Sequence, residues 1–180
     1  STWRGERSLA GSGALLEHSI HDIDILEWLL GPIVAVGAQQ SYFHGLDGIE
    51  DSVTVLLRFA DGATGSLSSI WHDVTSRPSQ RRVEVFCEHA LITLEGEFFG
   101  PLRCQRSDGE VVLEGDELMT WLARRGIPVS STEQDFLVQV ARGLAGDPVE
   151  RVRPDVGDAR RAHELVDAIY RSAAGGGAPV

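Results

Sequence analysis

Residues 13–31 read GALLEHSIHDIDILEWLLG, and their spacing decides how the chain begins to fold. Apolar side chains recur at helical intervals through this stretch, at positions 15, 16, 20, 23, 26, 29 and 30. Gly31-Pro32 follows them, and helices commonly end at such a pair. The spacing therefore predicts a helix over 13–30 with one apolar side.

After this helix, the next part of the chain has the short apolar runs that are typical of strands. These runs predict strands over residues 33–43, 52–60, 63–72, 82–87, 91–95, 102–106 and 111–114. Asp61-Gly62 joins the second run to the third as a hairpin turn. The middle of the chain is therefore expected to form a mostly antiparallel sheet.

Helical patterns return in the last third of the chain. Ser131 or Thr132 can cap one helix, and Asp155 can cap a final helix with an apolar stripe over 156–173. Residues 115–128 fit either a short helix or a loop. The order of helix, strands and helices predicts an α+β fold, in which an open, mostly antiparallel sheet carries helices on one face.

Composition excludes several classes of function. The chain has 180 residues and a formal net charge of -11, which repels nucleic acid and anionic membrane surfaces. No apolar run reaches the roughly 18 residues of a membrane span, and the N-terminus lacks a signal-peptide pattern, so we expect a cytoplasmic protein. All 16 basic residues are arginine, which excludes a Schiff-base lysine or a lysine general acid within this chain.

The first helix carries the densest group of polar side chains. Glu17, His21 and Asp24 are spaced i, i+4 and i+7 and therefore share one helix face, with His18 beside them. A histidine between carboxylates can act as a general acid or base near neutral pH. The same pattern is also compatible with a solvated helix face that carries ion pairs.

A metal site is a second interpretation of these residues. His18 and His21 could supply ligands together with Asp22, but a third and fourth ligand would have to come from distant residues such as His72-Asp73. We therefore expect no metal site. Trp71, next to His72, could form the aromatic wall of a pocket or could pack within the sheet.

Gly11-Ser12-Gly13 resembles the beginning of a dinucleotide-binding loop. No strand precedes it, however, and Leu16 lies where that pattern requires another small residue. We expect a loop before a helix, and no cofactor-binding residues in this chain.

Several stretches together resemble one protein family. They are Trp3-Arg4, residues 11–31, residues 59–65 (FADGATG), residues 83–86 (VEVF), Phe136 and residues 168–173 (AIYRSA). They resemble the C-terminal domain of the glucose-fructose oxidoreductase/inositol dehydrogenase (Gfo/Idh/MocA) family, and the likeness covers nearly the whole chain. Members of this family join an N-terminal Rossmann domain, which binds NAD or NADP, to a second domain that contacts the substrate.

The resemblance implies roles for individual residues. His21 matches the family histidine that acts on the substrate hydroxyl proton, while the family's catalytic lysine belongs to the Rossmann domain. Glu17 stands where the family often has an aspartate that touches the substrate. His18, Asp24 and His72 are expected to contact the substrate as well.

The resemblance also implies what the chain does as a unit. Residues 1–174 are expected to form the substrate-binding and oligomerisation domain of an NAD(P)-dependent oxidoreductase, which acts on a sugar, polyol or related hydroxy compound. Residues 175–180 are expected to be a flexible tail. Because the Rossmann domain is not in this sequence, we expect the isolated chain to be inactive.

The sequence is also compatible with two other functions, and it predicts self-association. NAD-assisted glycoside cleavage and a non-catalytic assembly module both remain compatible with the same resemblance. The family commonly pairs through its sheet, so we expect a homodimer or homotetramer. Alternation around Val53-Val55-Leu57 and Leu67-Ser69-Trp71 suggests that the uncovered face of this sheet is partly apolar.

Overall fold

The computed structural model describes residues 3–74, 76–77, 80–96, 100–124 and 155–180. The chain divides into two compact units, which are described separately. The first unit comprises Ser1–Asp73 with Arg153–Val180, and the second comprises Val74–Val152.

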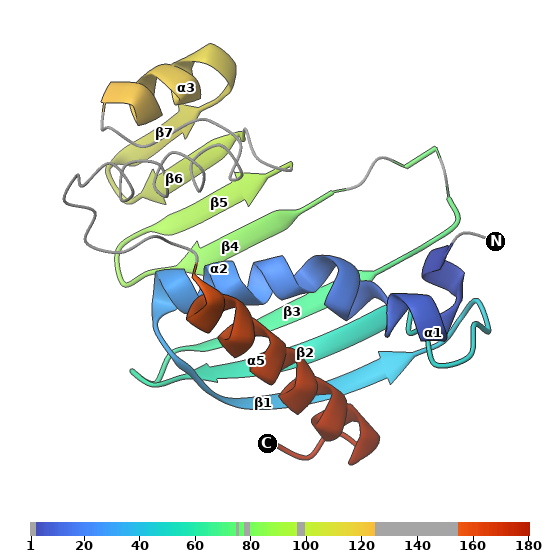
Figure 1. Cartoon of the computed structure of the whole chain (residues 1–180). Helices are drawn as coiled ribbons and strands as arrows, with labels where there is room; N and C mark the ends of the chain where they lie inside the picture. The colour runs from blue at the N-terminus through green and yellow to red at the C-terminus, as the bar shows by residue number, and fades with distance from the viewer. Residues whose placement is uncertain (1–2, 75, 78–79, 97–99, 125–154) are drawn as a thin grey trace, which may run out of the picture. The chain divides into compact units, whose positions relative to one another are not determined.

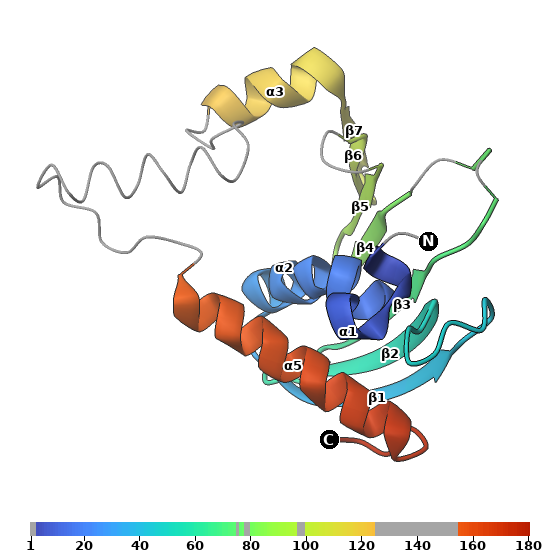
Figure 2. The same ribbon diagram turned by 45° about the vertical axis from the view of Figure 1, so that its right-hand side comes forward.

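The first unit is a three-stranded sheet with helices on one face (Figures 1 and 2). Its elements are η1 (Trp3–Gly5), α1 (Arg7–Ala10), η2 (Leu15–Ser19), α2 (Ile20–Leu30), β1 (Ile33–Ser41), β2 (Ser52–Phe59), β3 (Thr64–Ile70) and α5 (Val156–Ala174). The strands are antiparallel in the order β1-β2-β3, and α2 and α5 both lie on the same side of the sheet.

The core of this unit lies between that sheet face and the two helices. Alternate residues of β2 point into it, and all four are at most 3% exposed: Val53, Val55, Leu57 and Phe59. Ile23 of α2 and Ile169 of α5 meet them from the helices, and both are completely buried. The apolar periodicity of the sequence therefore marks the buried side of both helices around Ile23 and Ile169, whereas Leu29 and Val156 of the predicted stripes are exposed.

The uncovered sheet face differs from the expectation. Val53, Val55 and Leu57 lie beneath the helices, so they cannot form the free face. The free face carries their alternate neighbours, of which Leu56 and Ile70 are large and apolar. Leu56 pairs with Gly37 on one side and with Ser66 on the other, so small residues surround it.

The last helix begins as the sequence predicts. The Asp155 carboxylate accepts hydrogen bonds from the N–H groups of Gly157 and Asp158, and the Asp158 carboxylate accepts one from the Asp155 N–H. This reciprocal capping box satisfies N–H groups that lack partners inside the helix. The helix predicted after Ser131 or Thr132 lies outside the described residues.

Residues 175–180 do not extend freely as a tail. Val180 and Val36 exchange two backbone hydrogen bonds of 3.0 and 2.9 Å, which place the tail along β1. Ser172 Oγ accepts from the Ala38 N–H and donates to the Ala178 carbonyl. The flexibility expected from the glycine-rich composition is thus opposed by contacts with residues far away in the sequence.

The second unit is a four-stranded antiparallel sheet with one described helix (Figure 1). Its elements are β4 (Arg82–Phe86), β5 (Leu91–Glu95), β6 (Leu102–Arg106), β7 (Gly109–Leu113) and α3 (Gly115–Arg124). The strands follow one another in chain order. The segment that the sequence left open between helix and loop is therefore helical over Gly115–Arg124.

The predicted α+β fold with antiparallel strands is confirmed. The strands form two ladders among the described residues instead of one continuous sheet. The break lies between β3, which ends at Ile70, and β4, which begins at Arg82.

Candidate functional site

The candidate residues lie on a helix that begins with an irregular turn. Leu15–Ser19 form a π-helical turn, in which the Ile20 N–H donates to the Leu15 carbonyl five residues back, and α2 continues from it. The regular helix expected over 13–30 is thus interrupted at Glu17 and His18. Such π turns are rare and occur often at functional sites.

Glu17 has a partner that the helical spacing did not indicate. Arg4 Nε donates to Glu17 Oε2 at 3.1 Å, and the Arg4 guanidinium lies 4.4 Å from the ring centre of Trp3. The Glu17 side chain is only 17% exposed, whereas that of Arg4 is 52% exposed. This contact orients the Glu17 carboxylate from outside the helix.

The other four predicted site residues differ in their exposure and in their contacts. The His21 side chain is exposed and makes no hydrogen bond within the described part of the chain. The His18 ring meets the edge of Trp71 at 5.9 Å between ring centres. His72 follows Trp71 and is exposed, and Asp24 is half-buried on α2. The structure thus brings the end of β3 to His18.

A buried carboxylate holds the start of this helix, and the sequence patterns gave no sign of it. Glu50 is 1% exposed. Its Oε2 accepts from Ser12 Oγ and the Gly13 N–H, each at 2.8 Å, and its Oε1 accepts from the Leu15 N–H at 3.0 Å. The Tyr170 hydroxyl of α5 donates to the same Oε1 at 2.9 Å.

The Tyr170 hydroxyl remains protonated in this network. Burial raises the pKa of Tyr170 well above its ordinary value; a hydrogen bond with Ser12 opposes this effect in part, and the adjacent Glu50 carboxylate raises the pKa as well. Tyr170 therefore acts as a hydrogen-bond donor to Glu50 across the neutral pH range.

The beginning of this helix does not fit the pyrophosphate of a dinucleotide. Helix N-termini bind phosphate through free N–H groups. Here the N–H groups of Gly13 and Leu15 are already bonded to the Glu50 carboxylate, and the preceding element is α1 and not a strand. Gly11-Ser12-Gly13 is therefore a loop that accommodates Glu50.

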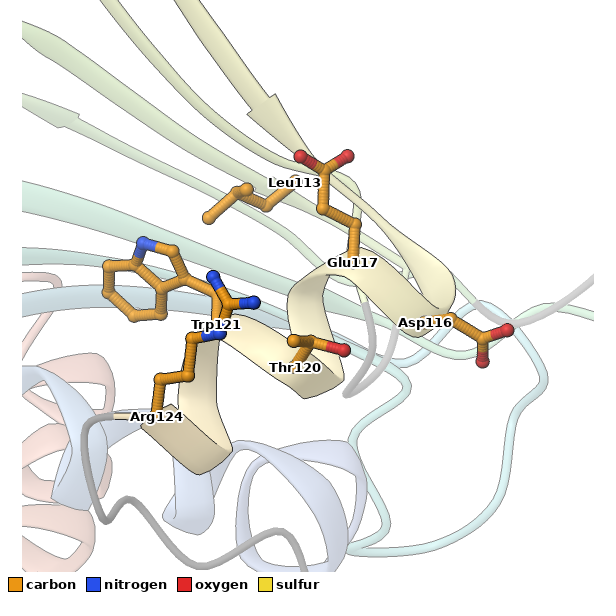
Figure 3. A pocket seen from close by; sticks show the side chains of 6 residues that line it. All are labelled: Leu113, Asp116, Glu117, Thr120, Trp121 and Arg124. Atoms are coloured by element: carbon orange, nitrogen blue, oxygen red, sulfur yellow. The ribbon is translucent and has the colours of Figure 1, made fainter.

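Each unit has a hollow among its described residues. A groove of about 420 Å³ in the first unit is lined in part by Ser12, Gln40 and Tyr170. A hollow of about 450 Å³ in the second unit lies beside α3 and is lined by Leu113, Asp116, Glu117, Thr120, Trp121 and Arg124 (Figure 3). Neither is lined by any of the five predicted site residues.

Within the described ranges, no three His, Cys, Asp or Glu side chains are grouped so that they could hold a metal ion. No helix there has both the length and the apolar character that a membrane crossing requires.

Comparison with known proteins places these features in a family. Residues 1–93 match the family model of the GFO/IDH/MocA C-terminal domain. The chain is 40% identical over 160 residues to 1,5-anhydro-D-fructose reductase of Ensifer adhaerens, which covers 79% of this chain and 46% of that protein. It is 32% identical over 91 residues to levoglucosan dehydrogenase of Pseudarthrobacter phenanthrenivorans, which covers 38% of this chain and 23% of that protein.

Solved structures share the fold. Aldose-aldose oxidoreductase from Caulobacter crescentus, in complex with glycerol, has a TM-score of 0.76 at 22% identity and covers all of this chain and 50% of its own. A levoglucosan dehydrogenase complex with NADH and levoglucosan has a TM-score of 0.75 at 24% identity, over 99% of this chain and 52% of its own. The chain spans less than half the length of the curated relatives that it matches. It belongs to the Gfo/Idh/MocA family, whose C-terminal domain it carries.

Proposed function

We propose that this chain is the substrate-binding and oligomerisation half of an NAD(P)-dependent oxidoreductase that acts on a sugar, polyol or related hydroxy compound. Membership of the family and the names of the two curated relatives support this proposal. The observation that carries it is the accessible His21 ring, one turn after Glu17, on a helix whose first turn is fixed by a buried carboxylate.

The proton step falls to His21. A nicotinamide cofactor, held by residues outside this chain, supplies the hydride acceptor. His21 takes the proton of the substrate hydroxyl as the carbonyl forms, and returns it in the reverse direction. Its exposed ring leaves both nitrogens available for this exchange.

Glu17 and its neighbours bind and orient the substrate in this proposal. The Arg4 contact occupies Oε2 of Glu17, so Oε1 is the oxygen that would accept from a substrate hydroxyl. Arg4 also keeps a negative charge next to the reacting centre partly compensated. His18, Asp24 and His72 complete the proposed contact set.

In this proposal, residues outside this chain hold the cofactor. The N–H groups at the start of the candidate helix are taken by Glu50, which argues against a pyrophosphate there. We propose that a separate Rossmann domain binds NAD or NADP. On this basis the 180-residue chain alone is inactive.

The test uses the complete protein that contains this chain. His21→Ala should lower kcat by about 100-fold or more, the usual scale for losing a general acid or base, with cofactor affinity nearly unchanged. His163→Ala is the matched control, because His163 is an exposed histidine on α5 whose Nδ1–H donates to the Ala159 carbonyl of the same helix. Undiminished turnover in His21→Ala would refute the assignment.

A further inference from the structure

We propose that Glu50 is a positioning residue, which fixes the helix that carries Glu17 and His21 and couples it to α5 through Tyr170. This inference rests on the proposed function of His21. The contacts that support it are all made by the buried Glu50 carboxylate and by the backbone of the same residue.

Four donors surround the Glu50 carboxylate, two at each oxygen. Ser12 Oγ and the Gly13 N–H donate to Oε2, and the Leu15 N–H and the Tyr170 hydroxyl donate to Oε1. A neutral amide cannot satisfy all four, because its nitrogen is itself a donor. The site is therefore built for a carboxylate and not for any polar side chain of similar length.

The backbone of Glu50 adds a third tie to the same helical turn. The Glu50 carbonyl accepts from the Ala14 N–H at 3.0 Å. Glu50 thus holds the N–H groups of Gly13, Ala14 and Leu15 in succession, and these groups have no partner within a helix. Glu17 is connected to this turn directly, because its N–H donates to the Gly13 carbonyl at 3.1 Å.

An ordinary helix cap comes from a neighbouring residue and fixes only the helix end. Glu50 lies 35 positions after Leu15 and two residues before the start of β2, so it fixes the helix relative to the sheet. The far end of α2 is held separately, where Arg161 of α5 donates to Glu27. Of these two anchors, only the Glu50 anchor lies next to Glu17.

The first experiment measures local amide exchange in the 180-residue chain. In Glu50→Gln, exchange at the Gly13 and Leu15 amides should rise by about 10-fold or more, while amides of β2 keep their protection. Glu27→Gln is the matched control, since it removes one charge from a carboxylate on the same helix that also bonds to α5. Equal protection at Gly13 and Leu15 in wild type and Glu50→Gln would overturn the proposal.

The second experiment measures kinetics in the complete protein at a temperature where both variants remain folded. Glu50→Gln should lower kcat by about 10-fold or more with little change in cofactor affinity, because small displacements of reacting groups are costly. Tyr170→Phe should lower kcat less, and Glu27→Gln should leave it unchanged. A purely structural role predicts reduced thermal stability with wild-type kcat in Glu50→Gln, and that result would refute positioning.

The two proposals fail in different ways. If His21→Ala is inactive but Glu50→Gln has normal kcat, the function stands and the positioning role of Glu50 falls. If His21→Ala keeps full activity, the function of His21 falls, whatever the amide exchange of Glu50→Gln shows.

Discussion

Gly13 lies directly against the backbone of Glu50. A Cβ atom on Gly13 would fall 1.8 Å from the Glu50 carbonyl oxygen and 2.7 Å from the Glu50 nitrogen. The two backbones approach so closely because Glu50 bonds to three successive N–H groups at this point. Only glycine leaves room for this contact.

Gly13→Ala should therefore destabilise the chain by at least about 2 kcal/mol, since the obstructing atoms belong to backbone and cannot rotate away. The free energy of unfolding in urea measures this loss. Gly65→Ala is the control, because a Cβ there would lie 3.6 Å from Phe59, an ordinary contact. A loss no larger in Gly13→Ala than in Gly65→Ala would contradict the prediction.

Stability should fall at alkaline pH because of Tyr170. Its pKa is raised in the folded state, chiefly by burial, so the unfolded chain loses this proton first as pH rises above about 10. The free energy of unfolding then decreases with pH, by at most about 1.4 kcal/mol per pH unit, and by less because the hydroxyl is partly solvated. Below about pH 10 the Tyr170 hydroxyl does not make the free energy of unfolding depend on pH.

This slope can be isolated because the chain has no lysine and only two tyrosines. Tyr170→Phe should reduce the alkaline slope in urea titrations, whereas Tyr42→Phe should keep it. The Tyr42 hydroxyl is near the surface and accepts from Gln40 Nε2. An identical slope in wild type and Tyr170→Phe would show that Tyr170 is not the group responsible.

The tie between α2 and α5 depends on one of two adjacent arginines. Arg161 donates to both carboxylate oxygens of Glu27 and to the Ile33 carbonyl, the last at 2.7 Å. Arg160 makes only an exposed pair with Glu164. Arg161→Ala should lower the free energy of unfolding by about 1–3 kcal/mol, and Arg160→Ala by about 0.5 kcal/mol or less. Thermal unfolding of the two variants measures the contrast, and equal losses would contradict it.

The helices and strands of the fold could be predicted from the sequence, because the patterns that indicate them involve residues only a few positions apart. Alternation in β2 and the capping residue Asp155 both act within a few positions. The π turn was not predicted, because its apolar residues keep nearly the same spacing as in an α-helix. The contact of the C-terminal residues with β1 was not predicted, because Val180 bonds to Val36, which is more than a hundred positions away in the sequence.

The candidate site was predicted only in part, for the same reason. Helical spacing predicted Glu17 and His21 on one regular helix, whereas Glu17 lies in the π turn and His21 lies in α2, which continues from it. It could not reveal that Arg4 bonds to Glu17 or that Glu50 holds the first turn, because both partners come from other segments. An acidic residue within two positions of the start of a strand, together with a glycine at the start of a helix, would be the sequence signal of such a contact.

Nucleotide binding should be absent from the isolated chain. A pyrophosphate at the Gly13 end of the helix would compete with the Glu50 carboxylate for the same N–H groups. Calorimetric titration of the 180-residue chain with NAD and with NADP should therefore show no saturable heat. A dehydrogenase of known affinity serves as the positive control. Micromolar affinity for either nucleotide would mean that the chain contains a cofactor site after all.

Self-association through the free face of β1, β2 and β3 remains a prediction. Leu56 is 65% exposed near the middle of this face, and the flanking Gly37 and Ser66 allow a second sheet to approach closely. A stable symmetric interface of this kind should bury more than roughly 1,000 Å².

Leu56→Arg would bring two like charges together across such an interface, so sedimentation equilibrium should shift from an oligomer toward the 19.5 kDa monomer. Leu9→Arg, at an equally exposed leucine on α1, should leave the oligomer intact. A wild-type chain that sediments as a monomer at tens of micromolar would overturn the prediction, since the free face would then be stable in water without a second copy.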